Sequence, residues 1–119
     1  MASYHLSCSW EIEGEVVVMR PEGYLNDQTE REFEGTLREA ARDSQRIVID
    51  ASGLIHVSSI GFGTLLAVAS DLRRGHGDLR IAALNPSLTR ALTLVFGPYF
   101  RLFETVPEAV RSFDAVAAG

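Results

Sequence analysis

The chain has 119 residues and a net charge of −5, which fits one globular domain over residues 1–119 and argues against the basic face that a nucleic-acid partner needs. No apolar run is long enough to cross a membrane, and the first residues lack the basic start and apolar core of a signal peptide, so we expect a cytoplasmic protein without membrane insertion. The single cysteine, Cys8, excludes an internal disulfide.

A β-hairpin is predicted first. Residues 4–12 alternate apolar and polar side chains, residues 16–19 are apolar, and Glu13-Gly14 lies between them. Alternation with a period of two is typical of a strand, and a short glycine-containing connection favours a hairpin. Pro21-Glu22-Gly23 is expected to end the second strand.

Helical and strand patterns then alternate to the end of the chain. In order, the sequence predicts a helix from Asn26 or Asp27 to about Arg42, a strand over 47–49, a helix over about 60–74, a strand over 79–84, a helix from Pro86 capped by Asn85, a strand over 100–103 and a helix capped by Thr105. The order β-β-α-β-α-β-α-β-α implies right-handed crossovers, a mostly parallel mixed sheet and one main helical layer. Residues 115–119 are expected to fray.

Two serines stand directly before a helix start with spaced glycines. Ser58 and Ser59 precede Gly61 and Gly63, and backbone N–H groups at a helix start favour an acceptor or an added negative charge. Helix capping, worth about 1 kcal/mol, explains the serines most simply. A nucleotide-binding loop is a weaker interpretation, because the full Gly-x-Gly-x-x-Gly pattern and a P-loop lysine are missing.

Four motifs in order resemble the STAS domain family, and within it the anti-sigma factor antagonists. They are Gly23-Tyr24-Leu25-Asn26, the run from Val57 to Gly63, Asn85-Pro86-Ser87-Leu88, and the later Leu102-Phe103 strand. The resemblance covers nearly the whole chain. It implies a STAS-like (SpoIIAA-like) α/β sandwich with an N-terminal hairpin and about four helices.

The resemblance also implies a regulatory protein–protein interaction rather than an enzyme. In that family the domain binds an anti-sigma factor, often a serine kinase of ATPase-like fold, and so frees a sigma factor. No cofactor or metal is expected. The implied partner-binding residues are Gly23, Tyr24, Asn26, Asp27, Ser58, Ser59, Ile60, Gly61, Phe62 and Gly63. Tyr24 and Phe62 would serve as aromatic anchors if exposed and as core residues if buried.

One departure from the family leaves the mode of regulation open. The hydroxyl that the family phosphorylates lies directly before the first glycine, where this chain has Ile60, and Ser58 and Asn26 replace the acids near it. Ser59 or Ser58 could instead accept the phosphate, since a helix start tolerates the added charge. The alternatives are constitutive binding by a scaffold or sensory-complex subunit, with other STAS proteins or a homodimer as partners, and a small-ligand or nucleotide-binding module. A Ser59–His56 nucleophilic pair is the weakest alternative.

Overall fold

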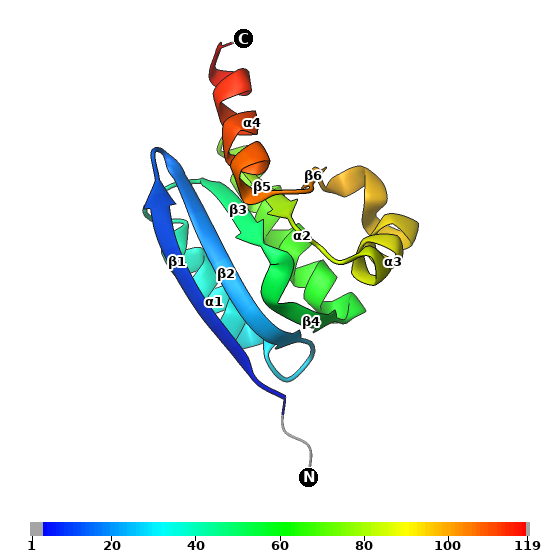
Figure 1. The fold of residues 1–119 in the computed structure, drawn as a ribbon. Helices are drawn as coiled ribbons and strands as arrows, with labels where there is room; N and C mark the ends of the chain where they lie inside the picture. Colours follow the sequence, from blue (N-terminus) through cyan, green and yellow to red (C-terminus); the bar gives the residue numbers. More distant parts are fainter. Residues whose placement is uncertain (1–3, 119) are drawn as a thin grey trace.

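The computed structural model describes residues 4–118, with side chains to residue 114. Within that range a six-stranded sheet has the order β1-β2-β3-β5-β6, with β4 paired to β2 (Figure 1). The elements are β1 (Leu6–Glu13), β2 (Val16–Leu25), α1 (Glu30–Ala40), β3 (Arg46–Asp50), the 3-10 turn η1 (Ala51–Gly53), β4 (Leu54–Val57), α2 (Ser59–Arg74), β5 (Asp78–Ala82), α3 (Pro86–Phe96), the 3-10 turn η2 (Gly97–Tyr99), β6 (Leu102–Phe103) and α4 (Val106–Ala118). The predicted α/β class is confirmed.

The predicted hairpin is confirmed, but its second strand is longer than expected. β1 and β2 pair antiparallel, and β2 continues through Pro21 to Leu25. β3 pairs with residues 17–19 of β2, whereas β4 pairs with residues 23–25. Pro21 lies between these two stretches, so its missing N–H interrupts neither parallel ladder. Pro21-Glu22-Gly23 therefore bends the strand instead of ending it, and the register shifts at Gly23/Tyr24.

β4 is a strand that the sequence did not predict. The segment between Asp50 and Ser58 forms the η1 turn and then a four-residue strand, so the order is β-β-α-β-β-α-β-α-β-α. The Asp50 carboxylate accepts a hydrogen bond from the Ser52 N–H at 3.1 Å, which closes the turn after β3. All the strand pairs except the hairpin are parallel in the described part of the chain, as predicted.

The core lies on both faces of the sheet. Side chains that alternate along the strands, such as Val17 and Ile47, pack on one face against α1, α2 and α3. Val16, Val18 and Val48 point to the opposite face, where α4 covers them (Figure 1). One main helical layer therefore exists as predicted, but α4 forms a second cover. Because both faces are buried, residues 16–19 read as a continuous apolar run.

Three helix starts follow the predicted caps, and one does not. Ser58, Asn85 and Thr105 each accept a hydrogen bond from the backbone N–H three residues later, at 3.2, 2.8 and 3.3 Å. α1 instead begins at Glu30, because Asn26 Oδ1 accepts from the Gln28 N–H at 2.9 Å and closes a separate turn. α4 runs to Ala118. The predicted fraying of residues 115–119 stays a prediction, and residue 119 lies outside the described residues.

α3 is attached to the fold by few side chains. Leu88 and Leu92 are its buried residues, whereas Leu94 is 81% exposed and Val95 is exposed beside it. Proline at its first turn and the Gly97-Pro98 pair after it set its bounds, as the sequence predicted. No helix in the described range 4–118 has the length and apolar character needed to span a membrane.

Candidate partner-binding site

The fold brings the two predicted partner-binding segments together. The Ser58 N–H donates to the Leu25 carbonyl oxygen at 2.9 Å, and Leu25 is paired with Val57 in the parallel register. Residues 23–27 and 58–63 therefore lie side by side where β2 and β4 end and α2 begins (Figure 1). We call these two segments together the β2–α2 surface.

The two serines of this surface have different surroundings. Ser58 is half-buried, and its hydroxyl oxygen accepts the Gly61 N–H, so it caps α2 as predicted. Ser59 is the first residue of α2 and is exposed, and its hydroxyl makes no hydrogen bond to another described residue. Only Ser59 therefore presents a free hydroxyl at the positive end of the helix.

The apolar residues of the surface also divide into exposed and buried. Ile60 is 53% exposed, which is unusual for a large aliphatic side chain. Phe62 is 4% exposed, and its ring lies 6.0 Å from the ring of Phe96. Of the two alternatives left open for Phe62, burial in the core is the one that the structure supports. Tyr24 is half-buried, with its ring edge-on to Tyr4 at 4.9 Å.

The glycines at the start of α2 have separate roles. A Cβ on Gly61 would lie 2.8 Å from the Leu25 carbonyl oxygen, so only glycine lets the helix approach the end of β2 this closely. A Cβ on Gly63 would meet nothing within 4 Å. Close packing thus explains Gly61 but not Gly63. Gly23 has a φ of +120°, which favours glycine, and a Cβ there would meet the His5 carbonyl.

A polar contact that the sequence did not predict fixes the two helices of the site. The Thr64 hydroxyl donates to Glu30 Oε2 at 3.0 Å, which joins the first turn of α1 to the second turn of α2. Asn26 is 8% exposed, and its side-chain oxygen accepts the Gln28 N–H in the turn before α1. Asn26 therefore stabilises the turn that carries the surface rather than contacting a partner directly. Asp27 is exposed and contributes a negative charge to the rim.

Neither the Ser59–His56 pair nor a metal-binding cluster is formed among the described residues. No hydrogen bond joins Ser59 to His56, and no group of three or more His, Cys, Asp or Glu side chains there is placed to hold a metal ion. Burial raises the pKa of the half-buried Cys8 thiol to about 11, so the thiol stays protonated near neutral pH.

Comparison with known proteins gives one family match. The model of the STAS domain matches residues 8–109. Among solved structures, an anti-sigma factor antagonist from Mycobacterium paratuberculosis is 23% identical, with 91% of this chain and 93% of that chain covered and a TM-score of 0.82. SpoIIAA of Bacillus is 19% identical in both of its forms. The match to the unphosphorylated form covers 95% of this chain and 97% of that chain, with a TM-score of 0.73. The match to the phosphorylated form covers 93% of this chain and 99% of that chain, with a TM-score of 0.65. At these identities the likeness to the structures shows the fold.

Proposed function

The chain belongs to the STAS domain family, and on that premise we propose that it acts as an anti-sigma factor antagonist, binding a regulatory protein through the β2–α2 surface. The proposed partner is an anti-sigma factor of the serine-kinase type. Binding would withhold that factor from its sigma factor. The role needs recognition alone, so we expect the chain itself to catalyse no reaction, and the setting would be the cytoplasm.

One observation supports this proposal above the others. The residues singled out on two distant segments meet at one surface through the Ser58–Leu25 hydrogen bond, and they leave Ile60 and Ser59 exposed at its centre. An aliphatic side chain of this exposure, with polar residues around it, has the composition of a small interface core. The similar structures named above include antagonists of anti-sigma factors.

The test is capture of partners by the tagged chain from its native cytoplasm, with wild type and two matched variants. Ile60→Asp places a charge at the centre of the β2–α2 surface, and Ile12→Asp places one on β1, where the side chain is 50% exposed against 53% for Ile60. We expect a kinase-fold anti-sigma factor with wild type and Ile12→Asp, and its loss with Ile60→Asp. Thermal unfolding of both variants checks that they fold.

Other outcomes of the capture decide between the alternatives. Recovery of other STAS proteins or of a sensory complex would replace the antagonist role with a scaffold role at the same surface. Equal capture by both aspartate variants would place the interface elsewhere. Stabilisation of the chain by nucleotide alone, rising with concentration and lost with changes at 58–63, would favour a ligand-binding module instead.

For regulation, we propose Ser59 as the phosphoacceptor. The Ser59 hydroxyl is exposed and unbonded within the described structure, whereas that of Ser58 is engaged with Gly61. A phosphate on Ser59 would add about −1.5 to −2 charge beside Ile60 and oppose docking of the partner. Incubation with the captured kinase and ATP should add one phosphate by mass, which Ser59→Ala abolishes and Ser58→Ala retains. Label that persists in Ser59→Ala would refute this assignment.

A further inference from the structure

A second candidate site lies at the other end of α2. Here a cavity of about 260 Å³ is lined by residues that include Arg46, Arg73, His76, Asp78, Arg80 and Phe113. Ser59 and Arg73 are separated by most of the length of α2, about 20 Å at 1.5 Å per residue. This cavity is therefore separate from the β2–α2 surface and independent of the function proposed for it.

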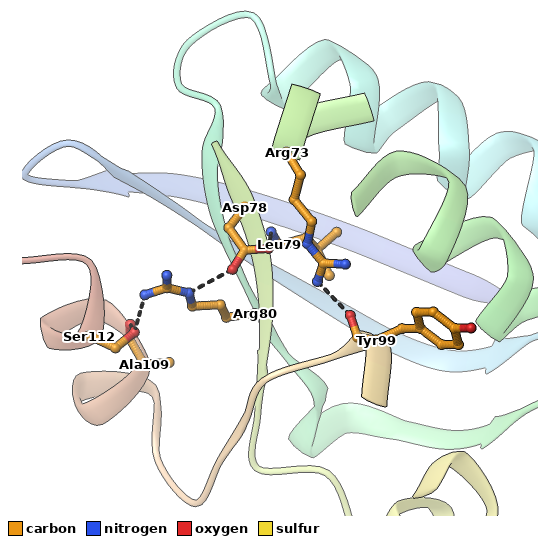
Figure 2. Close-up of polar contacts among 7 residues, drawn as sticks. All are labelled: Arg73, Asp78, Leu79, Arg80, Tyr99, Ala109 and Ser112. Atoms are coloured by element: carbon orange, nitrogen blue, oxygen red, sulfur yellow. Dashed lines mark hydrogen bonds and ion pairs between the residues drawn. The ribbon is translucent and has the colours of Figure 1, made fainter. Parts of the chain in front are cut away.

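Arg80 is the buried cation of the cavity. Its side chain is 6% exposed, and its guanidinium lies 3.9 Å over the ring of Phe113. Nε donates to Asp78 Oδ2 at 3.0 Å, and Nη1 donates to the Ser112 hydroxyl at 2.7 Å. In Figure 2 no dashed line joins the third nitrogen, Nη2, to another of the residues drawn. Because no fully buried side-chain nitrogen or oxygen among the described residues lacks a partner, this nitrogen keeps some solvent-accessible surface.

Arg73 and Arg46 also line the cavity, and the Arg73 guanidinium lies on the other side of β5 from that of Arg80 (Figure 2). Arg73 Nε donates to Asp78 Oδ1 at 2.8 Å, and its Nη2 donates to the Tyr99 carbonyl at 2.6 Å, which leaves its other terminal nitrogen without a partner (Figure 2). The Arg46 guanidinium makes one ion pair with a described residue, at 3.4 Å to a Glu15 carboxylate whose side chain is 86% exposed. An exposed, distant carboxylate neutralises an arginine weakly.

The charges that line this cavity do not balance. Arg46, Arg73 and Arg80 carry three positive charges, whereas Asp78 is the one carboxylate in the lining, and both of its oxygens are already engaged. The nearby end of α2 does not repel an anion strongly, because the N–H groups of Gly75, His76 and Gly77 cap its last carbonyls. The His76 ring lies in the same lining.

From this arrangement we propose that the cavity binds a small phosphate-type dianion, either inorganic phosphate or a phosphate monoester. The three arginines of the lining, with one carboxylate among them, match the double negative charge of such a group, and guanidinium N–H groups suit its acceptor oxygens. The volume is several times the roughly 30 Å³ share of one water molecule. A phosphate with part of its ester group therefore fits, whereas a folded partner does not.

Titration calorimetry in phosphate-free buffer at constant ionic strength tests the proposal, with inorganic phosphate and AMP as the probes. Arg46→Gln removes one donor group without touching the Asp78 contacts, and Arg90→Gln removes the same charge from an exposed position on α3. We expect saturable binding to wild type and Arg90→Gln, weakened about tenfold or more in Arg46→Gln. Tighter binding of AMP would identify the ligand as an ester, and binding of phosphate at least as tight would identify the free ion.

Amide chemical shifts of the unaltered protein give a readout that no folding defect of a variant can confuse. On addition of either probe, we expect changes at residues 46, 73–80 and 113 and not at 58–63. Absence of saturable binding by both probes would overturn the proposal. Equal weakening of binding in Arg46→Gln and Arg90→Gln would also overturn it, because it would mean a general charge effect. Chemical-shift changes confined to residues 58–63 would overturn it as well.

Discussion

Replacing Asp78 by asparagine removes the negative charge that holds two arginines at the amino end of β5. The carboxylate accepts hydrogen bonds from Arg73 Nε at 2.8 Å, Arg80 Nε at 3.0 Å and the Leu79 N–H at 2.9 Å. Removing one partner of a buried ion pair costs about 3–5 kcal/mol, because the other charge is left uncompensated. Arg80 is buried, but the Arg73 side chain is 34% exposed and water can solvate it. We therefore expect about 3 kcal/mol of lost stability, or about 10–15 °C in Tm.

Urea unfolding followed by fluorescence measures this loss, since Trp10 is the single tryptophan of the chain. Asp71→Asn is the matched control. The Asp71 carboxylate, 39% exposed, pairs with Arg74 and, at 3.0 Å, with Arg38. Exposed pairs contribute less than about 1 kcal/mol. If Asp78→Asn and Asp71→Asn lower the free energy of unfolding by the same amount, the buried Arg80–Asp78 pair does not contribute the stability that we assign to it.

The same contact predicts a dependence on pH. Burial alone would raise the pKa of Asp78, but the hydrogen bonds from Arg73 and Arg80 outweigh burial and hold the pKa below its ordinary 3.8. A lowered pKa contributes stability that is present above the ordinary value and is lost as the pH falls through the folded-state value. Wild type should therefore lose stability below about pH 4 more steeply than Asp78→Asn. Parallel curves would contradict this reasoning.

Three smaller predictions concern single positions. Gly61→Ala should destabilise by at least about 1–3 kcal/mol, because its Cβ would meet the backbone of β2, whereas Gly63→Ala should stabilise by roughly 0.5–1 kcal/mol, and urea midpoints separate the two. Ser58→Ala should cost about 1 kcal/mol through loss of the cap, and Ser59→Ala should stay within about 0.5 kcal/mol in the same assay. Alkylation of Cys8 at pH 8 should be about a hundredfold slower than that of an unshifted thiol, with its pKa raised by burial to about 11, and a rate equal to that of free cysteine would contradict the burial.

Local signals in the sequence were enough to predict most of the fold. The side chains of Ser58, Asn85 and Thr105 accept hydrogen bonds from backbone N–H groups only three residues later. A short stretch of sequence is therefore enough to predict these helix caps. β4 escaped prediction because its four residues become a strand only by pairing with β2 beyond Pro21. That pairing depends on the bend in β2, which is a tertiary feature.

The candidate sites divide in the same way. The serine turn was visible because Ser58, Ser59 and Gly61 are adjacent, and the resemblance to the STAS family implied that residues 23–27 lie beside it. The hydrogen bond to Leu25 itself depends on β4, which the sequence did not predict. The arginine-lined cavity was not visible, because Arg46, Arg73 and Arg80 come from three elements and look like scattered surface charges in the sequence. Their convergence becomes evident only once β3, β5 and the end of α2 are placed together.

The sparse attachment of α3 has a consequence for how the domain fluctuates. Leu88, Leu92 and the partly buried Phe96 hold the helix, while residues 16–19 of β2 and 47–49 of β3 are fully buried. α3 can detach and return as one unit at a free-energy cost well below that of global unfolding. Its amide hydrogens should then exchange with solvent long before those of β2 and β3, so that a native ensemble contains a small population in which the sheet is intact and this helix is loose.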